Sequence, residues 1–335
     1  MSLNRREFLK TAAAGSGGLL LGLQARPAAA AQVHLPHEAV GMLYDATLCI
    51  GCKVCMVSCK KFNSTGNGAL ALKGRDKPPY ETSGAGIWDE PRDLSSTTLS
   101  IIKVAKSGTA VNKDAVENGY SFVKQNCLHC VDPACVSVCP VAAFQKDPVT
   151  GIVFYEADRC IGCRYCMIAC PFRIPRYEYE RAFPVVRKCQ LCRHRIAEGK
   201  YAACCEFCPT GASIYGRVED LRAEAKRRLA LKAGTEAEFP VQTVQGPGTL
   251  RSTVARYENH VYGLTEVGGT QVMLLAGVPF DRLGFDAKLP DQFLPDLTWA
   301  YIKKIPALIV GVAAVGGITA AVTSRMSQGK EGERR

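Results

Sequence analysis

The chain has 335 residues, 17 cysteines and a formal net charge of +11. This length is enough for one or two domains with a hydrophobic core, whereas disulfide scaffolds are usually short, and an odd cysteine count rules out complete pairing. The positive residues are scattered and form no basic helix or aromatic platform, so nucleic acid is excluded as the expected partner. The composition leaves metal binding as the main use for so many thiols.

The N-terminal segment has the order of an export signal. A charged stretch with Arg5 and Arg6 precedes a weakly apolar run over 11–23 and the small-residue stretch 25-ARPAAAAQ-32. The arginine pair and the Phe-Leu-Lys soon after it resemble the twin-arginine signal, whose route carries proteins already folded around their cofactor. We expect 1–31 to be this signal, and an ordinary secretory signal is the alternative.

All the cysteines fall in four groups, which are 49-CIGCKVCMVSC-59, 127-CLHCVDPACVSVCP-140, 160-CIGCRYCMIACP-171 and 189-CQLC-192 with 204-CCEFCP-209. The first and third groups align at a constant offset of 111 residues, together with the tyrosine five residues before each first cysteine. The second and fourth groups pair similarly, with a longer middle in the fourth. Such an internal repeat indicates a structural unit used twice.

The spacing C-x₂-C-x₂-C-x₃-C-P is the bacterial ferredoxin run for [4Fe–4S] clusters. Three thiols of one loop can bind three irons of one cubane, while the fourth binds the other cluster of a pair. We expect the proline after the fourth cysteine to lie in the first turn of a following helix. Zinc is the alternative, but zinc sites use two C-x₂-C pairs per ion and rarely a third cysteine two residues on.

Sixteen cysteines make four clusters, so one thiol is left over, and it is Cys204 or Cys205. Cys204 keeps the C-x₃-C-P spacing to Cys208, whereas Cys205 does not. We therefore expect Cys204 to be a ligand and Cys205 to be a small buried side chain. His129 and His194 lie beside ligand cysteines, but a full set of thiolates is available, so we expect both histidines to lie around the clusters without binding iron.

The segments between and after the cysteine groups give weaker signals. Residues 60–118 are rich in loop-forming residues and predict an insertion with short strands such as 97–104, which either contacts a partner or only covers the first cluster. Residues 217–233 have a helical period with many charges, which predicts a solvated amphipathic helix. Residues 269–280 predict a buried strand, and 281–298 predict a linker.

The C-terminal stretch 305-IPALIVGVAAVGGITAAV-322 has eighteen residues without a charge. This length nearly crosses the hydrocarbon core of a bilayer, and Trp299 and Tyr301 precede it where an aromatic belt would lie. We expect a transmembrane helix over 299–324 and, from the export signal and the arginines that follow, a cytoplasmic tail over 325–335. A buried core helix is the alternative.

In this order, with an export signal before and one apolar helix after, the four groups resemble the four-cluster electron-transfer subunits of membrane-bound bacterial oxidoreductases. Within this family the chain is most similar to the subunits that serve nickel–iron hydrogenases. The stretches that share this likeness include 41-GMLYDATLCIGC-52, 147-DPVTGIV-153 and 269-GTQVMLLAGVP-279. The resemblance covers nearly the whole chain and is weakest in 60–118.

The resemblance implies an α+β fold of tandem bacterial ferredoxin-like units with inserted loops and one C-terminal transmembrane helix. The cluster domain would span 41–218, and a C-terminal extension and linker would span 219–298. It also implies four [4Fe–4S] clusters with these ligands: Cys49, Cys52, Cys55 and Cys208 for cluster 1; Cys127, Cys130, Cys135 and Cys170 for cluster 2; Cys139, Cys160, Cys163 and Cys166 for cluster 3; Cys59, Cys189, Cys192 and Cys204 for cluster 4.

The resemblance further implies a subunit that performs no catalysis and relays electrons. Its partners would be the small and large subunits of a periplasmic nickel–iron hydrogenase and an integral membrane quinone-linked subunit, with the chain anchored at the periplasmic face of the inner membrane. The same relay serving a molybdopterin oxidoreductase, such as formate dehydrogenase or a sulfur-compound reductase, is an alternative. A zinc-rich structural or assembly protein is a further alternative.

Overall fold

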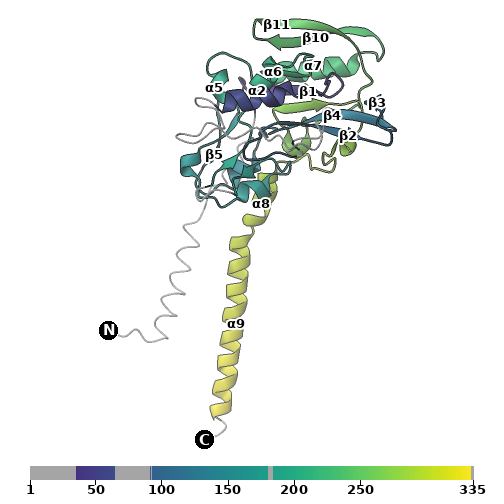
Figure 1. Ribbon diagram of the computed structural model, residues 1–335. Coiled ribbons are helices and arrows are strands. Elements are labelled where there is room, and N and C mark those ends of the chain that lie inside the picture. Colours follow the sequence, from purple (N-terminus) through teal and green to yellow (C-terminus); the bar gives the residue numbers. More distant parts are fainter. Residues whose placement is uncertain (1–34, 65–90, 92, 180–183, 333–335) are drawn as a thin grey trace. The chain divides into compact units, whose positions relative to one another are not determined.

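The computed structural model describes residues 35–64, 91, 93–179 and 184–332 (Figure 1). The predicted export signal and the part 65–90 of the predicted insertion, together with residue 92, lie outside the described residues. In the described part, short helices alternate with small sheets, as expected for a mixed α and β chain with many metal ligands.

A three-stranded sheet lies at the centre of the fold, with β1 (Val40–Asp45) between β9 (Ser213–Arg217) and β12 (Val272–Leu275). Strand β1 pairs antiparallel with β9 and parallel with β12, so that Met42 lies opposite both Tyr215 and Val272. All four residues of β12 are buried, as predicted for 269–280. A strand covered on both faces reads as a continuous apolar run, which explains this signal.

The two faces of β1 serve different parts of the molecule. Leu43 packs with residues of α7 (Val218–Ala230), the amphipathic helix predicted over 217–233. Met42 and Tyr44, which point to the other face, pack in the main core together with thiols of the first and fourth cysteine groups. Because side chains alternate along a strand, one strand supports both the outer helix and the cysteine loops.

A fully buried ion pair joins α7 to the end of β1. Arg228 donates from Nη1 to Asp45 Oδ2 at 2.9 Å and from Nε to Glu224 Oε1 at 2.7 Å, and Tyr257 donates to the same Asp45 oxygen at 2.7 Å. Removing one partner of such a pair costs about 3–5 kcal/mol because it leaves a buried charge uncompensated. The pair therefore fixes the position of α7 against the sheet.

Four further sheets, one with three strands and three with two, complete the strands of the described part. They are β2 (Ile101–Lys106), β4 (Gly119–Gln125) and β3 (Asn112–Lys113); β5 (Phe144–Lys146) with β6 (Val153–Tyr155); β7 (Arg176–Tyr177) with β8 (Val186–Arg187); and β10 (Glu236–Thr243) with β11 (Gly246–Thr253). The strand predicted at 97–104 begins later, at Ile101. The β10–β11 hairpin was not predicted, because most of its side chains are exposed and give no alternating apolar signal.

The remaining helices are short, except at the C-terminus. They are α2 (Val54–Asn63), α3 (Ala134–Ser137), α4 (Tyr165–Ala169), α5 (Arg193–Ile196), α6 (Ala203–Glu206), and the 3₁₀ turns η1 (Ala157–Arg159), η2 (Glu266–Gly268) and η3 (Phe280–Leu283). The predicted linker over 281–298 therefore contains the end of η3 and the first residues of a further helix.

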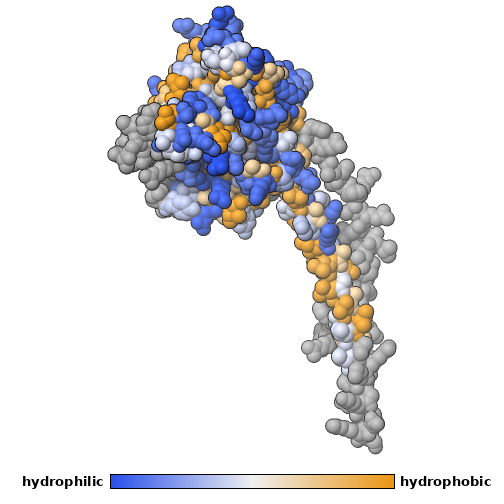
Figure 2. All heavy atoms as spheres, turned by 90° about the vertical axis from the view of Figure 1, so that its right-hand side faces the viewer, coloured by the Kyte–Doolittle hydropathy of each residue, from blue (hydrophilic) through white to orange (hydrophobic). Residues whose placement is uncertain are grey.

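The chain ends in α8 (Leu294–Ile302) and α9 (Ile305–Gly332). By length and composition, the stretch Leu294–Ala321 is long and apolar enough to cross a membrane, and none of its most apolar eighteen-residue window is buried. The apolar surface of α9 is visible in Figure 2. This exposure contradicts the alternative of a buried core helix. Pro306 is the second residue of α9, where its missing N–H costs nothing.

Candidate metal centres

The third cysteine of every group occupies the same place in its local structure. It is the second residue of a short helix in each case: Cys55 in α2, Cys135 in α3, Cys166 in α4 and Cys204 in α6. The fourth cysteine follows four residues later in all four groups. Because the third and fourth cysteines have the same spacing and the third has the same helix position in every group, each group presents its last two thiols in a similar way.

The repeat between the first and third groups extends to the backbone. Gly51 and Gly162 have φ of 70° and 73°, and Lys53 and Arg164 have φ of 59° and 63°. The left-handed region is unfavourable for a residue with a Cβ atom, so Lys53 and Arg164 hold a strained conformation. Both copies turn the chain sharply between the second and third cysteines, immediately before α2 and α4.

Backbone N–H groups in these loops donate to the cysteine sulfurs. The first thiols of the first and third groups each accept from the glycine two residues on at 3.4 Å, and similar bonds of 3.3 Å and 3.1 Å occur in the other groups: Gly51 to Cys49, Gly162 to Cys160, Leu191 to Cys189 and Ala143 to Cys139. Hydrogen bonds of this kind stabilise anionic sulfur and tune iron–sulfur clusters.

The prolines after the fourth cysteines differ from the sequence prediction. Pro140, Pro171 and Pro209 do not begin a helix, because each follows a short helix that has already ended. A proline disfavours helical geometry in the residue before it, and Cys170 is accordingly extended with ψ of 113°. At Pro171 the proline therefore keeps α4 from continuing past Ala169. Lys60 follows Cys59 instead, so α2 continues to Asn63.

Three of the four thiols predicted for cluster 1, Cys49, Cys55 and Cys208, lie close to one another. Burial raises the pKa of Cys49, and the Cys208 thiol raises it further. Burial also raises the pKa of Cys55 to about 12, with contributions from Cys204, Cys49 and Cys208. Cys52 belongs to the same loop and is exposed. The structure thus brings a fourth-group cysteine, 150 positions along the chain, beside the first group.

The thiols predicted for cluster 4 also gather. Burial raises the pKa of Cys59 well above its ordinary value, and the nearby thiols that add to this shift are Cys192, Cys189 and Cys204. Asn63 donates from its side chain to Cys192 Sγ at 3.4 Å and so links α2 to the fourth group. These four thiols come from two groups that are far apart in sequence.

The remaining eight thiols form two further sets. Burial raises the pKa of Cys130, and the thiols that add to it are Cys170, Cys127 and Cys135, the set predicted for cluster 2. Burial raises the pKa of Cys166 to about 12, and the thiols that add to it are Cys160, Cys163 and Cys139, the set predicted for cluster 3. The sets predicted for clusters 2, 3 and 4 are therefore groups of four neighbouring thiols, and three thiols of the cluster 1 set are neighbours.

Shared packing connects one set to the next, because Cys55 and Cys204 lie in one hydrophobic core, Cys189 and Cys127 in another, and Cys166 and Cys135 in a third. The Cys204 thiol of the cluster 4 set raises the pKa of Cys55 in the cluster 1 set. The Cys127 thiol of the cluster 2 set raises the pKa of Cys189 in the cluster 4 set. Cys166 of the cluster 3 set acts on Cys135 of the cluster 2 set in the same way. The sets therefore follow one another in the order 1, 4, 2, 3.

The two adjacent cysteines of the fourth group have different surroundings. A hydrogen bond from the Cys205 thiol, helped by the Lys124 ammonium, lowers the pKa of Cys204 to about 5 despite burial. Burial raises the pKa of Cys205, which is completely enclosed. Cys204 raises the pKa of two thiols of the first group, Cys55 and Cys59, and of Cys189 in its own group, while the thiols that raise the pKa of Cys205 are its neighbours Cys204 and Cys208.

Both histidines beside the cysteine groups bind backbone atoms. His129 is fully buried, and its Nδ1 accepts from the N–H of Val153 at 3.0 Å. Burial, followed by Lys188 and Lys146, lowers the pKa of His129 well below its ordinary value, so the ring is neutral. His194 is half-buried, and its Nε2 lies 3.1 Å from the carbonyl oxygen of Phe62.

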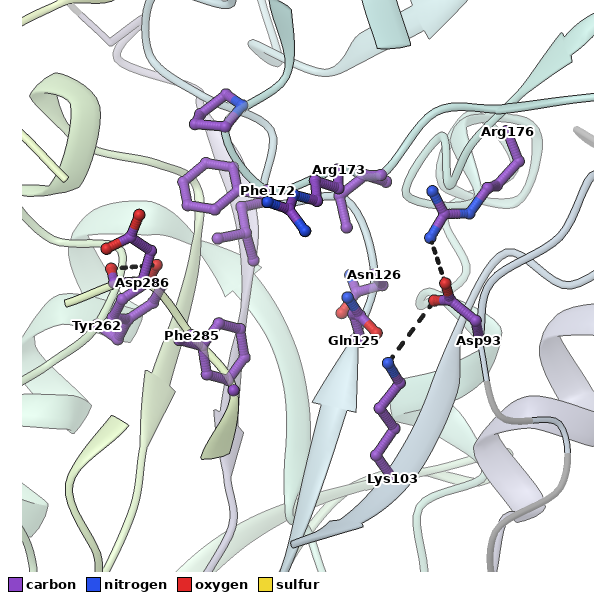
Figure 3. A pocket seen from close by; sticks show the side chains of 14 residues that line it. Asp93, Lys103, Gln125, Asn126, Phe172, Arg173, Arg176, Tyr262, Phe285 and Asp286 are labelled. Carbon is purple, nitrogen blue, oxygen red and sulfur yellow. Dashed lines mark hydrogen bonds and ion pairs between the residues drawn. The ribbon is translucent and has the colours of Figure 1, made fainter. Parts of the chain in front are cut away.

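A cavity of about 470 Å³ lies beside the predicted cluster 2 ligands (Figure 3). Its lining includes residues next in sequence to Cys127 and to Cys170. On one wall Asp93 forms ion pairs with Arg176 at 2.8 Å and with Lys103 at 3.6 Å. Because Asp93 is paired with two cations, and these cations lower its pKa against the effect of burial, it is a poor candidate for a general base.

The donor sets fit cubanes better than single ions. Among the residues that the structure describes, no three His, Cys, Asp or Glu side chains converge closely enough to bind one ion. A tetrahedral zinc site holds its thiolates about 3.8 Å apart, as follows from a Zn–S bond of about 2.3 Å. In a [4Fe–4S] cluster each cysteine binds a different iron, so the thiols stand further apart. Sets of neighbouring but not converging thiols match the second geometry.

Comparison with known proteins agrees with this chemistry. A family profile described as a 4Fe-4S dicluster domain matches residues 119–218, which contain the second, third and fourth cysteine groups. The hydrogenase-2 operon protein HybA of Escherichia coli O157:H7 is 46% identical over 287 residues, which are 84% of this chain and 83% of the relative.

Two further relatives belong to other complexes. The formate dehydrogenase-O iron-sulfur subunit of Escherichia coli K12 is 35% identical over 58% of this chain and 58% of its own length. The iron-sulfur subunit of the nitrate-inducible formate dehydrogenase from the same strain is 34% identical over 62% of this chain and 65% of its own length. These matches are shorter than the match to HybA.

Proposed function

Because this chain belongs to the family of HybA, the iron–sulfur electron-transfer subunits of hydrogenase-2, we propose that it relays electrons from a periplasmic nickel–iron hydrogenase to an integral membrane quinone-linked subunit. The chain is an electron-transfer subunit and performs no bond chemistry itself. Its own residues hold [4Fe–4S] clusters, keep water from them and set their surroundings.

The proposed relay uses four clusters in tandem ferredoxin-like units. Each would be held by one of the four thiol sets given above, with Cys204 as a ligand and Cys205 left free. The clusters supply one-electron carriers when bound. What supports the assignment is that most thiols of each set are neighbours and that the repeat places equivalent thiols on equivalent helix positions.

The observation that carries the proposed function is the order of the four sets. Neighbouring sets are linked by close thiols, so an electron entering at either terminal set would meet the others in sequence. Cys52 in the cluster 1 set is exposed, and Cys163, its repeat equivalent in the cluster 3 set, is partly exposed. A row that reaches the surface at both ends suits a protein with one partner for entry and another for exit.

The location and domain boundaries belong to the same proposal. The exposed apolar stretch of α8 and α9 supports anchoring of the chain at the membrane, with the cluster domain over 41–218 on the periplasmic side and the extension over 219–298 between them. Export by the twin-arginine route would deliver a protein that has already received its clusters. The signal over 1–31 and the tail over 325–335 complete this division.

The test is reduction by H₂ of the purified full chain mixed with its hydrogenase subunits in detergent. We expect the visible absorption to bleach and signals of reduced clusters to appear by electron paramagnetic resonance (EPR). A Cys59→Ser variant, which removes a ligand of the second cluster in the row, should pass electrons to a quinone acceptor at least tenfold more slowly. Wild-type protein that stays oxidised under H₂ would contradict the hydrogenase assignment.

A formate-linked relay is the second candidate, because two formate dehydrogenase subunits match more than half of this chain. Replacing the hydrogenase by a formate dehydrogenase catalytic subunit, with formate in place of H₂, tests it in the same assay. Reduction by formate but not by H₂ would favour this candidate.

A further inference from the structure

Two lysines lie buried inside the cluster domain without a carboxylate partner. The side chain of Lys124 comes from β4 and that of Lys188 follows β8; the two residues are 1% and 2% exposed. In the described part of the chain, no Asp or Glu oxygen lies within ion-pair distance of either ammonium group. Burying an unpaired charge is strongly unfavourable, so each position implies another source of negative charge.

Lys124 lies at the junction between the cluster 1 and cluster 4 sets. Its Nζ donates to Ser213 Oγ on β9 at 3.0 Å, and the Cys204 thiol is the neighbour that most raises the pKa of Lys124, against the effect of burial. Its positive charge lowers the pKa of Cys55 in the cluster 1 set and of Cys59 in the cluster 4 set, against the effect of burial. One ammonium group therefore faces two sets of thiols that are neighbours in the row.

Lys188 lies at the next junction, between the cluster 4 and cluster 2 sets. Its Nζ donates to the carbonyl oxygens of Val153 and Cys189, the second at 3.0 Å. Cys189 belongs to the cluster 4 set, while the charge of Lys188 acts on Cys135 and Cys170 of the cluster 2 set. Lys188 thus lies between the cluster 4 and cluster 2 sets, as Lys124 lies between the cluster 1 and cluster 4 sets.

We propose that Lys124 and Lys188 are fixed positive charges at two successive junctions of the row, each stabilising an electron on the clusters at either side. This inference rests on the proposed function. An electron makes a cluster more negative, and a nearby buried ammonium group offsets that charge in a medium that screens it weakly. Each lysine therefore raises the reduction potentials of the two clusters beside it together and keeps these two potentials similar.

The cluster 3 set provides an internal reference. The largest influences on the pKa of Cys166 are burial and the thiols of its own set, which are Cys160, Cys163 and Cys139. Neither buried lysine is among them. We therefore expect the potential of cluster 3 to depend little on either lysine.

The experiment is an anaerobic potentiometric titration of the full chain, followed by EPR and by iron content. Lys124→Met should lower the potentials of clusters 1 and 4, and Lys188→Met should lower those of clusters 4 and 2. Each shift should reduce the ratio of reduced to oxidised cluster at least tenfold at a given potential, which is about 59 mV for a one-electron couple. Lys124→Arg keeps the charge and should retain the wild-type potentials.

Lys226→Met serves as the matched control, because Lys226 is exposed on α7 and should leave every potential unchanged. Unchanged potentials in the two buried methionine variants with full iron content would overturn the proposal, and so would an equal shift of all four clusters. If Lys124→Met loses iron, the iron content of Lys124→Arg decides between the outcomes. Retained iron in Lys124→Arg supports a need for positive charge at this position, and lost iron overturns the proposal. A wild-type chain without iron–sulfur clusters would instead refute the proposed function.

Discussion

The two copies of the cluster loop, 49–59 and 160–170, share a backbone but have different surroundings. Both place a glycine at positive φ after the first cysteine, and both begin a helix one residue before the third cysteine. The helix of the first copy has ten residues and that of the second has five. Pro171 ends the second helix, whereas Lys60 at the equivalent position allows the first to continue.

Burial separates the copies further. Cys49, Cys55 and Cys59 of the first loop are all buried, and two of them belong to the main core beside β1. In the second loop Cys166 alone is buried, and it packs in a small core with few members. The comparison indicates that local sequence sets where the thiols point, while residues from distant parts of the chain set how dry and how charged each site is.

The largest expected effect comes from the fourth group, where the sequence offers two adjacent candidates for one position. Cys204 has the helix position of Cys55 and Cys166, and we predict that Cys204→Ser loses one cluster, about four of sixteen irons per chain. Cys205→Ser should keep all four clusters. Iron and acid-labile sulfide assays on the anaerobic protein measure both.

The opposite result would break the rule that local position selects the ligand. If Cys205→Ser lost the cluster and Cys204→Ser kept it, equal helix position would not mean equal role. The two variants differ by one position in one helix, so each controls for the general effect of a serine there.

A smaller effect should distinguish the two loop glycines. Gly51→Ala and Gly162→Ala both place a Cβ atom at positive φ, which costs about 1–2 kcal/mol. The added atom would lie 2.3 Å from the Phe122 ring at Gly51 but 3.1 Å from the Tyr177 hydroxyl at Gly162. Overpacking against the buried Phe122 should add roughly 1–3 kcal/mol to the first variant only.

Thermal unfolding of the two glycine variants, at matched iron content, tests this difference. We expect Gly51→Ala to lower the Tm clearly more than Gly162→Ala does. Equal losses would show that the surroundings of the two loops matter less than their backbone, and the comparison would then need revision.

Patterns that repeat locally could be predicted from the sequence. The alignment of the first and third groups predicted two equivalent loops, the charged helical period predicted α7, and the uncharged run predicted the exposed apolar helix α9. The ligand sets were predicted from a family resemblance and stay a prediction, which the proximity of the thiols supports.

Features that depend on distant contacts could not be predicted. Lys124 looks like an ordinary polar residue of a strand, and it is enclosed by residues from distant parts of the chain, such as Ser213 and Cys204. The motif predicted that Pro171 lies in the first turn of a helix. This was wrong, because the motif does not reveal that α4 has already ended at Ala169. Strands β10 and β11 pair through backbone hydrogen bonds, which side-chain periodicity does not report.

Iron and acid-labile sulfide content of anaerobically purified protein, together with its EPR spectrum after dithionite, tests whether the chain holds four [4Fe–4S] clusters. We expect about sixteen irons and sixteen sulfides per chain and signals from several interacting reduced clusters. A colourless protein that contains zinc, or one with iron for only two clusters and no further signal after reconstitution, would contradict this expectation.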